Sequence, residues 1–157
     1  MEPDNQYMQE AVALSREHMQ KGEGGPFGCV IVKDGSVVGR GWNSVLATHD
    51  PTAHAEVMAI RDACQRLGTF QLAGCDLYTS CEPCPMCLGA IYWARPDRVF
   101  YANDKTDAAH IGFDDSFIYD ELRLPMAQRK IPMIALDKKE ALKVFQLWDS
   151  KTDKTRY

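Results

Sequence analysis

The chain has 157 residues, of which 45% are hydrophobic and 25% are charged, and its formal net charge is −4. This length and composition predict one globular domain that spans residues 1–157. The acidic balance argues against an extended surface for nucleic acid, so we expect no nucleic-acid partner. The N-terminus lacks the basic and apolar stretches of a signal peptide, and no apolar run is long enough to cross a bilayer. We therefore expect a cytoplasmic protein without a membrane partner.

The first part of the chain is predicted to hold two helices and a hairpin. An amphipathic helix over about residues 5–21 ends in glycines. Two strands, at 29–33 and 36–42, flank Asp34-Gly35, a dipeptide that favours a tight antiparallel turn. A polar connection leads to a second helix over about residues 54–68, with His18 expected on the exposed side of the first helix.

A strand–helix–strand unit is predicted next. Residues 75–80 and 97–102 have the pattern of strands, and the helix 84–94 between them contains no charged residue. A helix that is apolar all round is typically buried. A crossover of this length predicts that the two strands are parallel.

The last part of the chain is predicted to hold a short helix near residues 114–124, a strand at 131–136, a helix from about 138 and a polar tail at 148–157. Together the elements predict an α/β fold. We expect a three-layer α/β/α sandwich around a mixed sheet of about five strands.

Three cysteines lie at equal spacing in the segment 79–87. Cys84 and Cys87 begin the apolar helix, with Pro85 at its first position, so both sulfurs share one face. The helix N-terminus favours their thiolate forms. Cys81 precedes the helix, on the turn, and does not belong to that face. In the reducing cytosol, such cysteines are more often metal ligands or catalytic groups than disulfide partners.

The choice of metal depends on the remaining ligands. An iron–sulfur site needs a fourth cysteine near the other three, and none follows Cys87. A catalytic zinc takes three protein ligands, histidine among them, and leaves one position for water. Of the histidines, only His54 lies on a core-facing stripe near a helix start. A structural zinc with Cys81 as a fourth ligand is the alternative.

Glu56 borders the buried face of the helix that follows His54, where an unpaired carboxylate is costly. It is either a capping or salt-bridged residue, or a general acid/base beside water activated by the metal. His54-Ala55-Glu56 together with Pro83-Cys84-x-x-Cys87 forms the H-x-E and P-C-x-x-C signature of zinc nucleobase deaminases. The order and helical context of both motifs favour the acid/base role.

On these motifs the chain resembles the cytidine-deaminase-like superfamily, and within it the bacterial guanine deaminases. The resemblance covers nearly the whole chain, in the segments 24–35, 50–61, 77–96, 99–102 and 112–119. It implies one catalytic Zn²⁺ per subunit, held by His54, Cys84 and Cys87 with water at the fourth position. Glu56 would move the protons. The zinc motif alone fixes the reaction type; the segment GFDDSFIY and the terminal tyrosine indicate guanine.

The resemblance also implies which residues contact the substrate. Asn43 would donate its side-chain amide to a purine carbonyl, and Asp115 would accept from guanine N–H groups and act as a second catalytic carboxylate. The alternative for Asn43 is turn chemistry, and Asp114 is better explained as a helix cap. The remaining implied contacts are Phe27, Ala55, Trp93 and Tyr157. Phe27 and Trp93 could equally be core residues.

The implied reaction is zinc-dependent hydrolysis of guanine to xanthine and ammonia. The implied assembly is a homodimer in which the tail, about residues 148–157, crosses to the partner and closes its site. Three other substrates remain open within the enzyme class: guanosine, ammeline and adenosine in tRNA. A non-catalytic module with a structural zinc is the alternative from another class.

Overall fold

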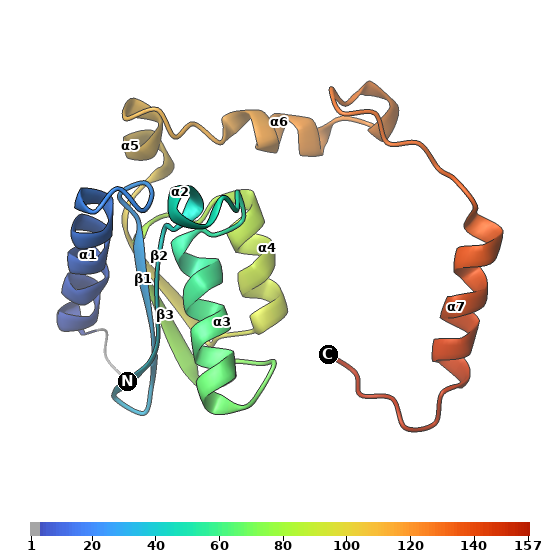
Figure 1. Ribbon diagram of the computed structural model, residues 1–157, viewed down its shortest axis with the longest axis horizontal. Helices are drawn as coiled ribbons and strands as arrows, with labels where there is room; N and C mark the ends of the chain where they lie inside the picture. The colour runs from blue at the N-terminus through green and yellow to red at the C-terminus, as the bar shows by residue number, and fades with distance from the viewer. Residues whose placement is uncertain (1–3) are drawn as a thin grey trace. The chain divides into compact units, whose positions relative to one another are not determined.

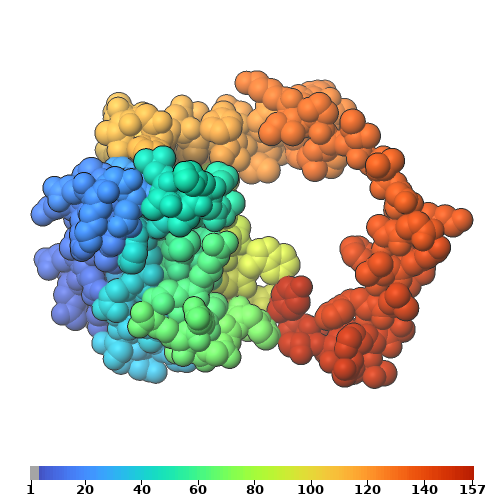
Figure 2. Space-filling view, viewed as in Figure 1, coloured from blue at the N-terminus to red at the C-terminus, as the bar shows by residue number. Residues whose placement is uncertain are grey.

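The computed structural model describes residues 4–157, which form two compact units. The first ends at Asp115 and the second is Ser116–Tyr157. The helices and strands of both are labelled in Figure 1. The side chains of the first unit, coloured from blue to green over most of its length, pack into a dense body in Figure 2. No helix among the described residues has the length and apolar character needed to span a membrane.

The first unit is built on a mixed sheet of four strands. These are β1 (Gly28–Lys33), β2 (Ser36–Trp42), β3 (Cys75–Cys81) and β4 (Arg98–Asn103), in the order β2-β1-β3-β4. β1 is antiparallel to β2 and β3, and β3 is parallel to β4. The predicted hairpin and the predicted parallel crossover are both confirmed. Both turn residues of the hairpin have positive φ, 49° at Asp34 and 76° at Gly35, as a type I′ turn requires.

Alternate residues of the strands supply two hydrophobic clusters, because successive side chains point to opposite faces of a sheet. Cys29, Ile31 and Leu77 pack with α3 (Ala55–Leu67) and α4 (Pro85–Ala94). Val30, Val32 and Tyr78 pack with Tyr7 of α1 (Asn5–Gln20). Figure 1 shows α1 on one side of the strands and α3 on the other.

β2 approaches the first turns of α3 closely because it carries glycine there. A Cβ atom on Gly41 would lie 2.2 Å from the carbonyl oxygen of Ala55. A Cβ atom on Gly39 would lie 2.7 Å from that of Ala59. The glycines therefore bring the end of β2 against the beginning of α3, where both deaminase motif residues, His54 and Glu56, are found.

The predicted helices are present, with small shifts at their ends. α6 (Ser116–Arg123) and α7 (Lys138–Ser150) follow the expected positions in the second unit. Three short elements were missed: α2 (Val45–Thr48), α5 (Lys105–His110) and the 3₁₀ turn Met126–Gln128. α2 lies in the connection that was predicted to be polar, and no element was predicted for the other two segments. α5 has no apolar stripe from which it could be predicted, and a capping box at Asp104 stabilises its start.

Three expectations were wrong. The segment 131–136, predicted as a fifth strand, forms no regular structure, and Ile131, Ile134 and Leu136 are at least 79% exposed. A strand requires a neighbouring edge, and this segment has none in its own unit. α4 is not buried all round, because Tyr92 and Trp93 are exposed. His18 is buried rather than exposed, in a polar cluster described below.

Candidate active site

Three potential metal ligands converge from two helix starts. His54 is the residue before α3, Cys84 is the residue before α4, and Cys87 lies in the first turn of α4. The Nδ1 atom of His54 lies 3.5 Å from the Sγ atoms of both Cys84 and Cys87. All three ligand atoms lie within 4.8 Å of one another. The predicted pairing of His54 with these two cysteines is therefore confirmed in space.

The spacing fits a zinc ion. Zinc binds sulfur at about 2.3 Å and histidine nitrogen at about 2.0 Å, so tetrahedral coordination places N and S about 3.5 Å apart. The observed separations of 3.5 Å match that value. A nitrogen and two sulfurs are also a donor set that zinc prefers.

The two cysteine sulfurs differ in their affinity for a proton. The hydrogen bond from the Cys87 thiol, joined by the one with His54, lowers the pKa of Cys84 to about 4. The same contact with Cys84, together with burial, raises the pKa of Cys87. The two sulfurs therefore favour sharing one proton over losing both. A metal ion that binds both must displace that proton, which makes metal affinity increase with pH.

Cys81 does not join these ligands. Its sulfur lies 3.7 Å from the carbonyl oxygen of Asp104, and burial raises the pKa of its thiol to about 11. Within the described part of the chain, His54, Cys84 and Cys87 are the only cluster of potential ligands with this spacing. Three protein ligands correspond to a catalytic zinc, which keeps one position open, rather than to a structural zinc, which has four. All six cysteines are free thiols.

Glu56 is buried in the first turn of α3, with 6% of its surface exposed. Burial raises the pKa of its carboxyl group, while hydrogen bonds to the carboxylate oppose that rise. The hydroxyl of Thr79, on β3, donates one of them to Glu56 Oε1 over 3.0 Å. The chain thus places a proton-accepting group of raised basicity next to the metal ligands.

Thr79 is a residue that the sequence analysis missed. It is 1% exposed, and its hydroxyl also lies 3.1 Å from the carbonyl oxygen of Cys81. A single threonine in a buried strand gives little signal by itself. Its alternation with Leu77 and Cys81 on one face of β3 would have placed it toward α3, where Glu56 lies.

Asn43 follows β2 and is 6% exposed. Its backbone N–H donates to the carbonyl of Phe27, and its Oδ1 accepts from the N–H of Val45 at 3.1 Å. The next residue, Ser44, donates its N–H to the carbonyl of Ala53 at 2.9 Å. Asn43 is therefore hydrogen-bonded into the segment that leads directly to His54.

The carboxyl group of Asp115 interacts electrostatically with the metal ligand Cys84. Burial raises the pKa of its carboxyl group, and the negative charge at Cys84 adds to the shift. Two residues before it, the ring of Phe113 meets that of Phe27 edge-on, with centroids 5.0 Å apart. Gly25 leaves room for this contact, because a Cβ atom there would lie 2.8 Å from Phe113. Phe113 is a second residue that the sequence analysis did not single out.

The remaining predicted site residues are less closely connected to the metal ligands. Ala55 is fully buried, with its carbonyl oxygen against Gly41. Trp93 lies near the end of α4 and is 66% exposed. Tyr157 ends the second unit and is 70% exposed. Within the first unit, Glu56 is therefore hydrogen-bonded to the ligand Cys87, and Asp115 is influenced by the charge at Cys84.

Comparison with known proteins identifies the same chemistry. The model of the cytidine and deoxycytidylate deaminase zinc-binding region matches residues 1–103. The guanine deaminase of Bacillus subtilis is 56% identical over 151 residues, which cover 96% of this chain and 97% of that protein. The X-ray structure of the Bacillus subtilis guanine deaminase matches 99% of both chains at 54% identity, with a TM-score of 0.95.

More distant relatives share less of the chain. A tRNA-specific adenosine deaminase of Aquifex aeolicus is 40% identical over 116 residues, 73% of this chain and 75% of that protein. A guanine deaminase structure from Nitrosomonas europaea matches 73% of this chain and 66% of its own at 30% identity, with a TM-score of 0.68. With the zinc-site geometry and these similarities together, the chain belongs to the zinc-binding family of cytidine and deoxycytidylate deaminases and is similar to a bacterial guanine deaminase over nearly its full length.

Proposed function

We propose that the protein is a guanine deaminase that hydrolyses guanine to xanthine and ammonia with one zinc ion per subunit. The observation that carries this proposal is the buried Glu56 carboxyl group in the helical turn that follows the ligand His54. A purely structural zinc site needs no buried carboxylate beside it. The similarity to the Bacillus subtilis guanine deaminase, over 96% of this chain, supports guanine as the substrate.

The roles of the side chains follow from their chemistry. Zinc, when bound, acts as a Lewis acid that activates water for attack on the amino-bearing carbon of the base. Glu56 accepts a proton from the attacking water at its carboxylate and passes it to a ring nitrogen. A second proton transfer through Glu56 lets the amino group leave as ammonia. The Thr79 hydroxyl holds Oε1 of Glu56 and so orients the carboxylate.

Substrate recognition is assigned to the residues around this centre. Asn43 has its Oδ1 committed to Val45, which leaves Nδ2 as the end that donates to the oxo group of guanine. Asp115 accepts from the N–H groups of the purine and serves as a second proton carrier. The other contacts are Phe27, Ala55, Trp93 and Tyr157.

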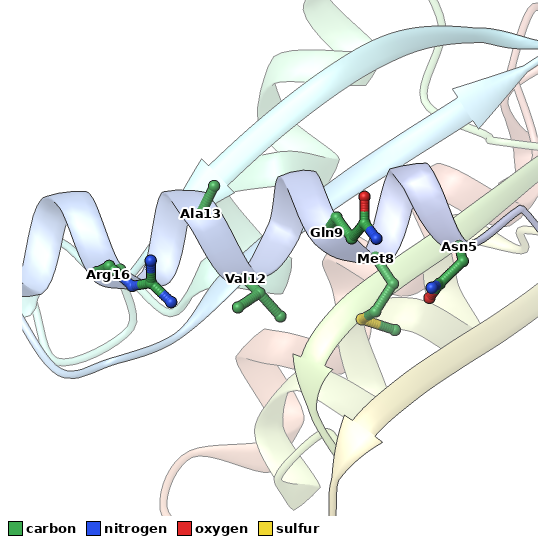
Figure 3. Close-up of a pocket in the computed structure, with 6 residues that line it drawn as sticks. All are labelled: Asn5, Met8, Gln9, Val12, Ala13 and Arg16. Atoms are coloured by element: carbon green, nitrogen blue, oxygen red, sulfur yellow. The ribbon is translucent and has the colours of Figure 1, made fainter.

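The assembly we propose is a homodimer of one deaminase domain, residues 1–157, whose tail near residues 148–157 closes the partner's site. One feature of the first unit supports it: β4 is an edge strand, with β3 as its only strand neighbour among the described residues. A pocket of about 370 Å³ lies against α1, lined by the residues labelled in Figure 3, and it includes neither the metal ligands nor Glu56. The segment 131–136 has the exposed apolar side chains to pair with β4 of a second copy as a fifth strand. This pairing would complete the three-layer sandwich.

The free thiols are consistent with a cytoplasmic protein.

The test is a panel of substrates assayed for ammonia release: guanine, guanosine, ammeline, adenine, cytosine, cytidine and a tRNA anticodon stem. We expect guanine to have the highest kcat/KM, with Glu56→Ala retaining zinc and losing at least about 10²-fold in kcat. Preference for another member of the panel would replace guanine. Full turnover by Glu56→Ala would remove Glu56 from the mechanism.

Two further variants test the other assigned residues. Asp115→Asn is expected to reduce guanine turnover far more than Asp114→Asn; equal small effects would make both residues helix caps. Removal of Arg156-Tyr157 is expected to impair turnover with zinc retained. Unchanged activity of that truncated chain would show that the tail does not contribute to the site.

A further inference from the structure

A cluster of three side chains joins the end of α1 to the end of β2, apart from the metal ligands. The rings of His18 and Trp42 stack with centroids 3.7 Å apart and planes 5° from parallel. One oxygen of Glu23, Oε2, lies 3.0 Å from His18 Nδ1 and 2.8 Å from Trp42 Nε1. A carboxylate oxygen accepts both bonds, and the indole N–H can only donate. Glu23 therefore holds the last residue of β2 by its side chain.

The backbone of Glu23 holds the next element as well. Its carbonyl oxygen accepts from the N–H groups of Leu46 and Ala47, at 3.1 and 3.0 Å. These donors belong to the first turn of α2, and Ser44, the residue before α2, makes no side-chain capping bond. Unsatisfied N–H groups at a helix start need such an acceptor. One residue thus satisfies the start of α2 and anchors the end of β2.

Asn43 lies between these two anchored points. Trp42 precedes it and α2 begins two residues after it, so Glu23 restrains the backbone on both sides. The glycine after Glu23 adds a third restraint, because a Cβ atom on Gly24 would lie 2.1 Å from Asn43 Oδ1. This close approach leaves the amide little freedom to tilt toward the Gly24 side.

We propose that Glu23 is a positioning residue for substrate recognition, which fixes the backbone that aims the Asn43 amide at the base. The inference rests on the substrate role assigned to Asn43 under the proposed function. It predicts that loss of the Glu23 side chain weakens guanine binding without disturbing the zinc ligands or Glu56. Nothing in this role requires Glu23 to touch the substrate.

The first test compares Glu23→Ala with Glu17→Ala, a matched control on α1 whose carboxylate forms only an exposed pair with Lys21. KM and kcat for guanine are measured together with zinc per subunit. We expect Glu23→Ala to raise KM about tenfold, because a displaced Asn43 amide loses its one hydrogen bond to the substrate. Its kcat and zinc content should stay near those of the unmodified protein. Glu23→Gln, whose amide oxygen still accepts from Trp42, should recover most of the affinity.

The second test is a double-mutant cycle, which separates positioning of Asn43 from general loosening. If Glu23 acts through Asn43, the Glu23→Ala change should alter KM less than about twofold in an Asn43→Ala background. A full additive effect there, or an unchanged KM in Glu23→Ala alone, overturns the inference while leaving guanine deamination intact. A normal KM in Asn43→Ala would instead remove Asn43 from the substrate site, and the inference with it.

A milder variant covers the case in which Glu23→Ala fails to fold or to retain zinc. Trp42→Phe keeps an aromatic ring against His18 and removes only the indole N–H bond to Glu23. We expect a rise in KM of about threefold, again absent in the Asn43→Ala background. An unchanged KM for Trp42→Phe overturns the inference in that case.

Discussion

The two compact units of the chain differ in how completely each satisfies its own apolar side chains. In the first, Ile31, Leu72 and Leu77 are fully buried around the sheet. In the second, residues 116–157, all of which the structure describes, include no buried residue. Most of its large apolar side chains are exposed, Ile134 by 85% and Leu136 by 89%.

This difference shows that only the first unit has a hydrophobic core of its own. The first unit holds its own core and the metal ligands, so its structure needs no further apolar surface. The second unit exposes many of its large apolar side chains, and large exposed apolar patches commonly mark association sites. The metal ligands and Glu56 all lie in the first unit, whereas the exposed apolar side chains of the second are the surface that the proposed homodimer would cover. Each of the following predictions tests one side of that contrast.

The largest effect is expected at the metal ligands. His54→Ala removes one of three ligands, so zinc should be lost and deamination should fall by at least about 10³-fold. Metal analysis and an ammonia assay measure both. His49→Ala, in an exposed turn, is the matched control and should keep its zinc. Retained zinc in His54→Ala would show that the metal is held elsewhere.

The core of the first unit gives the next largest effect. Leu77→Ala should lower the free energy of unfolding by about 3 kcal/mol, because it empties a fully buried site. The same substitution at Leu46, which is 65% exposed, should change it by less than about 0.5 kcal/mol. Denaturant unfolding measures both. Equal effects would contradict the description of the first unit as a self-contained core.

In the second unit, a charge should act on association rather than on folding. Ile134→Glu should weaken the proposed homodimer at least about a hundredfold, because a carboxylate cannot enter an apolar interface without cost. Light scattering across a dilution series measures the shift to monomer. Lys139→Glu, on the polar side of α7, should leave the dimer intact. A dimer that withstands Ile134→Glu does not use this segment.

The smallest effect concerns the pH profile of the first unit. Thr79→Val should lower kcat about tenfold, since the carboxylate of Glu56 loses its hydroxyl donor. That donor lowers the pKa of Glu56, so its removal raises the pKa further above the ordinary range. The base must be ionised to accept a proton, and the acid limb of the activity profile should therefore move to higher pH. Thr79→Ser should restore both values, and an unmoved acid limb would contradict the role.

Local patterns predicted much of the fold. The Asp34-Gly35 turn, the helical spacing behind His54 and the uncharged helix after Cys84 each depend on residues near one another in the chain. The segment 131–136 shows where this reasoning fails. Its composition predicts a strand, but a strand forms only beside an available edge, and neighbouring residues cannot supply that edge. The short α2 and α5 were missed because their termini, not apolar stripes, stabilise them.

Some residues of the candidate site could likewise be predicted from local sequence, and others could not. The spacing of Cys84 and Cys87 at a helix start, with His54 and Glu56 at another, was sufficient to predict the zinc ligands and the reaction type. The exclusion of Cys81 also followed from its place before the helix. The Thr79 bond to Glu56 and the restraint of Asn43 by Glu23 required the tertiary structure. They depend on contacts between residues about 20 positions apart, such as Thr79 with Glu56. The sequence by itself determined which atoms could bind zinc; packing of the sheet against α1 and α3 decided which other side chains support them, because only packing brings distant polar groups within hydrogen-bond distance.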